Sequence, residues 1–349
     1  MYYNYEEKEN PVEVVVVQPN IDPYRVKFTM PPEEQLEHML NMARGKITPE
    51  TEFVLFPETA LQEFASLYAD RNGIQLEGLW ERNMENSFSV KIIREFLADF
   101  EDLNIVFGMS SKKLYDTDER PTKSARYIES LDTYYDSYNA ALHINNTDKL
   151  DIYYKSKLVV GVEQMPFISI LGFLDDLAIN LGGTTGTLGI QEERSVFTSP
   201  YTGIQTGVAI CYESIYGEFV GGYVNNGADF ISIITNDGWW DDTPGYHQHK
   251  YYASMRAIEH RRSIARSANT GTSCFINQRG DISDQTPWWE EAVIRKKINM
   301  NDEITFYTQY GDYIPRVASF LAVLLLVFTV AKRLNKTAQR LEGENPKNV

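Results

Sequence analysis

Glu58, Lys155 and Cys211 have the three kinds of side chain that can together transfer an acyl group. Cys211 ends a small apolar run typical of a strand, and a helix-like stretch follows it. A cysteine at such a turn is held rigidly near free backbone N–H groups, as an acyl-transfer nucleophile requires. Taken alone, however, most single cysteines are small core residues.

Glu58 and Lys155 can supply the base and the oxyanion donor that a thiol needs for acyl transfer. Little of an ordinary thiol is ionised near neutral pH, so a neighbouring carboxylate is needed to take its proton during attack. A lysine ammonium, helped by the backbone N–H of Tyr212, can stabilise the tetrahedral oxyanion. Taken alone, Glu58 is more typical of a helix N-terminal acid, and Lys155 of a solvated surface charge. The chain order Glu, Lys, Cys also differs from that of papain-like proteases.

Two further carboxylates lie close in sequence to these residues. Glu163 follows Lys155 by eight positions, where it can either orient Lys155 or hold Glu58. Glu213 comes two positions after Cys211, where it can support the nucleophile or act as a helix N-terminal acid favoured by the helix dipole. We interpret Glu163, Tyr212 and Glu213 as supporting residues.

Trp239 and Trp240 are adjacent and follow Asn236-Asp237-Gly238. Tryptophan combines a large apolar ring with a polar N–H, which suits contact with a membrane interface or an acyl chain. We therefore predict a mobile loop that binds lipid. The alternative is an ordinary aromatic core.

An ordered set of motifs from Gln18 to Asp312 resembles those of the nitrilase (carbon–nitrogen hydrolase) superfamily, and within it the apolipoprotein N-acyltransferases. The motifs are Val17-Gln-Pro-Asn-Ile21, Phe56-Pro-Glu-Thr59, Tyr154-Lys-Ser-Lys-Leu-Val159 with Glu163, Ile210-Cys-Tyr-Glu213, Thr235-Asn-Asp-Gly-Trp-Trp240, Gln248-His249, Met255-Arg-Ala-Ile-Glu259, Arg266, Asn269-Thr-Gly-Thr-Ser273 and Thr308-Gln-Tyr-Gly-Asp312. The resemblance implies an α-β-β-α sandwich and a catalytic triad of Glu58, Lys155 and Cys211.

The resemblance also implies an activity. The expected reaction is N-acylation of the α-amine of the diacylglyceryl-cysteine of bacterial lipoproteins, with a phospholipid acyl donor and a cysteine thioester intermediate. The expected partners are the phospholipid, the diacylglyceryl-modified apolipoprotein and a membrane. Two alternatives stay open: a superfamily hydrolase of a small amide or nitrile, and an inactive membrane-tethered binding module.

Composition excludes several other classes. The net charge of −16 argues against nucleic acid as a partner, because phosphate binding needs a basic surface. Cys211 and Cys274 form no disulfide framework, and Cys274 is expected in the core. His247 and His249 have no third ligand at metal-like spacing. We expect neither a metal nor a cofactor.

Hydrophobic periodicity predicts alternating strands and helices, which indicate an α/β layered fold. The expected strands cover residues 13–17, 53–56, 103–109, 207–210, 229–235, 272–277 and 291–298, with a hairpin of 137–144 and 150–154. The expected helices cover residues 33–44, 88–100 and 247–267.

The C-terminal region predicts a membrane anchor. Residues 313–334 are mostly apolar and long enough to cross a bilayer, and Lys332 and Arg333 lie at their end. By the positive-inside rule, the tail of residues 335–349 is cytoplasmic. We expect the catalytic domain, residues 11–312, to face the periplasm from the bacterial inner membrane.

The N-terminal segment, residues 1–10, is polar and acidic, with neither an apolar stretch nor a basic start. It is therefore not expected to be a signal peptide. Members of the resembled family carry a multi-span membrane bundle before the catalytic domain. We expect such a bundle upstream, encoded by a longer or split gene. A naturally short relative is the alternative.

Overall fold

The computed structural model describes residues 4–27, 29–64, 66–69, 75–116, 118–164 and 187–343. The chain divides into two compact units, Met1–Thr308 and Gln309–Val349. Of the predicted N-terminal segment, residues 1–3 lie outside the described part. Of the predicted cytoplasmic tail, residues 344–349 do.

Two β-sheets form the centre of the first unit. One sheet has the order β16-β1-β2-β6-β8-β7, with β5 paired to β6 and β9 paired to β8. Its strands are β1 (Pro11–Gln18), β2 (Thr51–Leu55), β5 (Leu79–Trp80), β6 (Asn104–Leu114), β7 (Arg126–Ile128), β8 (Thr133–Ile144), β9 (Leu150–Tyr154) and β16 (Ala292–Asn299). The predicted hairpin is confirmed, because β8 and β9 pair antiparallel.

The second sheet has the order β10-β11-β12-β13-β14-β15. Its strands are β10 (Val196–Thr198), β11 (Gln205–Ile210), β12 (Phe230–Thr235), β13 (Ile264–Ala268), β14 (Cys274–Ile276) and β15 (Ile282–Ser283). A separate ribbon pairs β3 (Ser66–Ala69) with β4 (Gln75–Glu77).

Strand β1 shows how the layers pack. Its side chains alternate between faces, so Val14 and Val16 join the core between the sheets while Val15 and Val17 join the core beneath the helices. Both faces of β1 are covered, which explains its unbroken run of valines.

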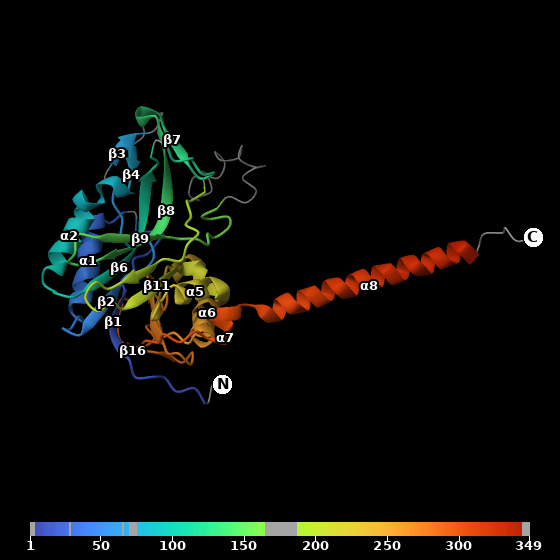
Figure 1. Cartoon of the computed structure of the whole chain (residues 1–349). Coiled ribbons are helices and arrows are strands. Elements are labelled where there is room, and N and C mark those ends of the chain that lie inside the picture. Colours follow the sequence, from blue (N-terminus) through green and yellow to red (C-terminus); the bar gives the residue numbers. More distant parts are fainter. Residues whose placement is uncertain are drawn as a thin grey trace, which may run out of the picture. The chain divides into compact units, whose positions relative to one another are not determined.

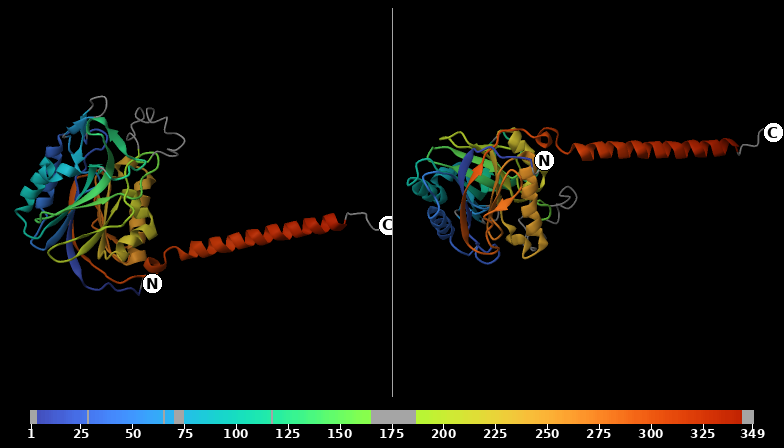
Figure 2. Two further views of the ribbon diagram at one scale, coloured as in Figure 1. Left: turned by 45° about the horizontal axis from the view of Figure 1, so that its top comes forward. Right: turned by 90° about the horizontal axis from the view of Figure 1, so that it is seen from below.

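Helices α1 (Pro32–Arg44) and α2 (Phe88–Leu97) cover the first sheet, and α5 (Gly217–Asn225) and α6 (Pro244–His260) cover the second, as Figure 1 and the turned views of Figure 2 show. The result is the predicted four-layered α-β-β-α sandwich.

The prediction of one helix over residues 247–267 is wrong. Helix α6 ends at His260, and Arg261 adopts a left-handed conformation with φ of 49°. Residues Ile264–Ala268 instead form the fully buried strand β13, which pairs in parallel with β12. Pairing within the sheet outweighs the local preference of this arginine-containing stretch for helix.

The second unit is dominated by the helix α8 (Tyr313–Gly343). The stretch Tyr313–Gln339 contains an 18-residue window with a mean hydropathy of 2.2, and it is long and apolar enough to cross a membrane. It is a candidate membrane span by length and composition.

Candidate active site

Glu58, Lys155 and Cys211 each lie just beyond the carboxyl end of a strand. Glu58 follows β2 and Lys155 follows β9, both in the first sheet, whereas Cys211 follows β11 in the second. The paired layers bring the three residues together, so that the charges of Glu58 and Lys155 act directly on the Cys211 thiol. This assembly depends on sheet packing rather than on closeness in sequence.

Lys155 lies between two carboxylates. Its Nζ is 2.9 Å from Oε1 of Glu58 and 2.8 Å from Oε1 of Glu163, and it is fully buried. Asn139 bridges the same two oxygens, because its Nδ2 donates to Glu58 at 2.7 Å and to Glu163 at 2.8 Å. Glu163 therefore contacts Lys155 directly and is linked to Glu58 through Asn139, which combines the two roles that the sequence left open.

Electrostatics keep the Glu58–Lys155 pair ionised. Burial alone raises the pKa of Glu58, but the Lys155 charge and the hydrogen bonds from Lys155 and Asn139 outweigh it and hold that pKa below its ordinary value. Burial alone lowers the pKa of Lys155, but the charges of the Glu58 and Glu163 carboxylates bring it above its ordinary value. Glu58 is thus a carboxylate at neutral pH and can accept a proton.

Cys211 has a strained backbone at a sharp turn. Its φ is 50°, a left-handed value that is uncommon for a residue with a Cβ, and it begins the 3₁₀ turn Cys211–Ile215. Burial, and next the Glu58 charge, raise the pKa of the thiol well above its usual range, although Lys155 opposes this. The thiol is therefore protonated at neutral pH and needs a base during attack.

Glu213 connects the cysteine segment to the lysine segment. One carboxylate oxygen accepts from the N–H of Ile210 at 2.8 Å, and the other accepts from the N–H of Ser156 at 2.5 Å and from the hydroxyl of Tyr153 at 2.8 Å. Burial raises the pKa of Glu213 to about 7. Besides stabilising its own turn, Glu213 joins the two segments that carry Cys211 and Lys155.

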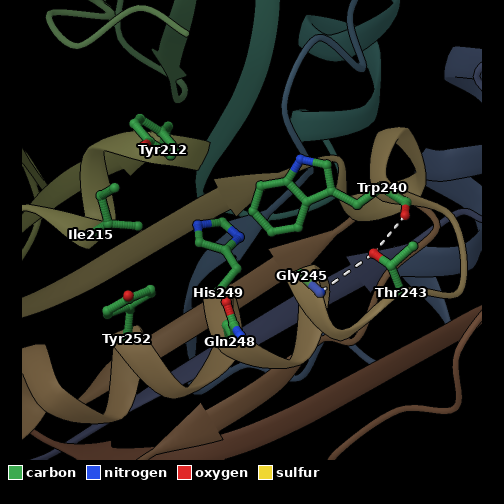
Figure 3. Close-up of a pocket in the computed structure, with 8 residues that line it drawn as sticks. All are labelled: Tyr212, Ile215, Trp240, Thr243, Gly245, Gln248, His249 and Tyr252. Carbon is green, nitrogen blue, oxygen red and sulfur yellow. Dashed lines mark hydrogen bonds between the residues drawn. The ribbon is translucent and has the colours of Figure 1, made fainter.

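A cavity of about 470 Å³ opens beside the cysteine turn (Figure 3). Its lining residues come from the 3₁₀ turn Cys211–Ile215, the 3₁₀ turn Asp237–Trp240, and helix α6 with its N-cap. They are Tyr212, Ile215, Trp240, Thr243, Gly245, Gln248, His249 and Tyr252. Cys211 is not among these lining residues, but its neighbour Tyr212 is, so the cavity lies against the turn that begins at Cys211.

The two tryptophans have different surroundings. Both belong to the 3₁₀ turn Asp237–Trp240. Trp240 lines the cavity, whereas Trp239 is 46% exposed and packs edge-on against Tyr24 at 5.1 Å between ring centroids. Contact of either ring with lipid stays a prediction.

Sequence reasoning missed a second buried cation beside Glu58. Lys27 is 6% exposed, donates a hydrogen bond to the Thr59 hydroxyl, and has its pKa lowered by burial to about 8, against the opposing charge of Glu58. It lies in a polar loop, and nothing in the local pattern distinguishes it from a surface lysine. Asn139 was missed as well, although strand alternation would have placed it on the same face as Ala141.

A buried polar chain lies behind the turn Cys211–Ile215, and in it Arg266 makes an internal ion pair. Arg266 Nη2 is 2.8 Å from Oδ1 of Asp237, and Nδ1 of His249 is 3.1 Å from the same oxygen. Within the described ranges, no group of three His, Cys, Asp or Glu side chains is placed to hold a metal ion.

The fold and the residues at the strand ends define the class of protein. Residues 13–306 match the sequence model of the carbon–nitrogen hydrolase family, so the chain belongs to that family. The yeast Saccharomyces cerevisiae protein Nit3, of the nitrilase superfamily, shares the fold with a TM-score of 0.52 and 16% identity, over 83% of this chain and 90% of that protein. An amidase from Nesterenkonia sp. shares it with a TM-score of 0.53 and 12% identity, over 89% and 97%.

Two curated relatives with the same name match most of this chain. An apolipoprotein N-acyltransferase of Chlorobaculum tepidum is 30% identical over 327 residues, which cover 92% of this chain and 58% of that protein. Another from Bdellovibrio bacteriovorus is 32% identical over 317 residues, covering 86% and 50%. The chain thus spans about half the length of these relatives.

Proposed function

We propose that this chain transfers an acyl group from a membrane phospholipid to the α-amine of a diacylglyceryl-cysteine on a bacterial lipoprotein. The observation that carries the proposal is the buried, ionised Glu58–Lys155 pair beside the protonated thiol of Cys211. This arrangement suits acyl transfer, and the names of the curated relatives favour an amine over water as the acceptor.

The first half-reaction acylates the cysteine. The Cys211 sulfur attacks the ester carbonyl while Glu58 takes the thiol proton, and the oxyanion is stabilised by the Lys155 ammonium and the Tyr212 N–H. The carbon–oxygen bond to the lysophospholipid then breaks, and Glu58 returns the proton to the departing alkoxide. The enzyme is left as a thioester.

The second half-reaction releases the acyl group. The α-amine attacks the thioester carbonyl, Glu58 accepts a proton from the amine, and the same donors stabilise the second oxyanion. The carbon–sulfur bond breaks, and the proton passes from Glu58 to the sulfur. The products are an amide and the restored thiol.

The lipid part of the proposal is supported by α8 and by the exposed Trp239. We propose that α8 anchors the chain in the inner membrane, with Lys332 and Arg333 on the cytoplasmic side and the catalytic unit in the periplasm. A membrane bundle upstream is the proposed partner for lipid delivery.

Intact mass spectrometry tests the proposal. The detergent-solubilised chain and its Cys211→Ala variant are incubated with phospholipid, and the expected result is an acyl-sized mass gain on the parent only. A diacylglyceryl-cysteine peptide should then remove the added mass and become acylated itself.

Two results would contradict the proposal. Release of the acyl group by water at the same rate with or without the peptide would indicate a hydrolase. A parent chain that gains no mass, even after an upstream membrane bundle has been joined to it, would indicate a binding module.

A further inference from the structure

His249 contacts the backbone of the nucleophile itself. It lies on α6, is 1% exposed, and its Nε2 is 2.9 Å from the carbonyl oxygen of Cys211. A carbonyl oxygen only accepts hydrogen bonds, so Nε2 carries the hydrogen and donates it. The Ser214 hydroxyl donates to the same oxygen at 2.8 Å. The carbonyl of the strained Cys211 is therefore held by two donors.

The imidazole is fixed from its other side as well. Its Nδ1 is 3.1 Å from Oδ1 of Asp237 and 3.0 Å from Nη2 of Arg266, and all three side chains are buried. The ring of Trp240 packs edge-on against it, with 5.1 Å between centroids. Figure 3 shows the His249 ring between Trp240 and the turn that carries Tyr212. The ring has little freedom to rotate.

Because a peptide unit is rigid, restraining the Cys211 carbonyl also restrains the Tyr212 N–H. The peptide unit that joins Cys211 to Tyr212 is planar and trans, so its C=O and N–H point in opposite directions. Fixing the carbonyl therefore fixes the direction of the Tyr212 N–H, the donor assigned to the oxyanion. Hydrogen bonds to the carbonyl also polarise the amide and strengthen the N–H as a donor.

We propose that His249, held by Asp237 and Arg266, is a positioning residue that aims the Tyr212 N–H at the acyl oxyanion. The proposal rests on the proposed function only in requiring that Cys211 form a tetrahedral intermediate. The nature of the acyl donor does not enter it.

The test compares two reactions of the same thiol in the full chain. Acylation by p-nitrophenyl acetate passes through an oxyanion, whereas alkylation by iodoacetamide does not. The variants are His249→Phe, which keeps a ring without a donor, and His249→Gln, whose amide nitrogen can replace Nε2. The matched control is His247→Phe, at an exposed position on the same helix.

For His249→Phe we expect acylation to fall about 100-fold, near the lower end of the loss of one oxyanion donor. Alkylation should stay within about threefold of the parent. His249→Gln should recover acylation to within about tenfold, and His247→Phe should leave both rates unchanged.

Equal losses of acylation and alkylation in His249→Phe would overturn the proposal in favour of a purely structural role. Unchanged acylation would overturn it directly, as would a parent chain that the ester fails to acylate. A parent that reacts with the ester but never with phospholipid contradicts only the proposed function.

Discussion

At the scale of single residues, Glu58 has two effects on Cys211 that oppose each other. Its charge raises the pKa of the thiol and so reduces the thiolate population, yet in the proposed mechanism its carboxylate removes the thiol proton during acylation. The two effects can be separated, because alkylation by iodoacetamide responds mainly to the thiolate.

Glu58→Gln should therefore change the two rates in opposite directions. We expect acylation by p-nitrophenyl acetate to fall about 1000-fold, since a general base contributes factors of this size. Alkylation at pH 8 should become faster, because removing the negative charge lowers the pKa of Cys211 toward its ordinary value. In the parent, the alkylation rate should keep rising with pH through the neutral range.

Stopped-flow and mass-spectrometric rates over a pH series measure both effects, with Glu37→Gln on the exposed side of α1 as the control. Slower alkylation in Glu58→Gln would contradict the electrostatic interpretation. Acylation within tenfold of the parent would contradict the role of Glu58 as the base.

At the scale of elements, the turn after β2 rests directly on strand β6. A Cβ added at Gly108 would lie 2.4 Å from the carbonyl oxygen of Pro57 and 2.5 Å from the Cα of Glu58. Both are backbone atoms, which cannot step aside as a flexible side chain would. Gly108 thus permits the close approach that places Glu58.

Gly108→Ala should displace the Glu58 turn. We expect a loss of about 1–3 kcal/mol in the free energy of unfolding, as for other overpacked sites, and at least about a tenfold loss of acylation, because small displacements of catalytic groups are costly. Urea unfolding and acylation rates check this. Gly45→Ala is the matched control, since its added Cβ would meet only an atom at 3.7 Å. Equal stability and activity in both variants would contradict the prediction.

The elements were predictable to different degrees, for physical reasons. The strand β1 has a continuous β-branched run and the helix α1 has an amphipathic pattern, and both arise from local residues. The three residues Glu58, Lys155 and Cys211 stand at strand ends with distinct motifs. Strand β13 and the contacts of Asn139, Lys27 and His249 arise only when distant segments pack, so no local pattern indicates them.

At the scale of the whole molecule, α8 is the candidate membrane span, and the proposed function uses it as the membrane anchor. A charged side chain near the centre of a span costs about 2.5–3.5 kcal/mol on insertion. A chain carrying both Val323→Lys and Leu326→Lys should therefore be released from membranes by alkaline carbonate, whereas the parent and Gln339→Lys should stay in the pellet. Release of the parent under the same conditions would contradict a spanning role for α8.

Glu213 has a consequence for protein engineering. It bonds to the backbone on both sides of the site, at Ile210 and at Ser156. If only Glu58, Lys155 and Cys211 were transplanted onto another layered scaffold, the buried carboxylate that links the two backbone segments would be lost. The distance between those segments would then no longer be fixed. A successful graft would have to include Glu213 as a fourth residue, together with the two backbone amides from which it accepts hydrogen bonds.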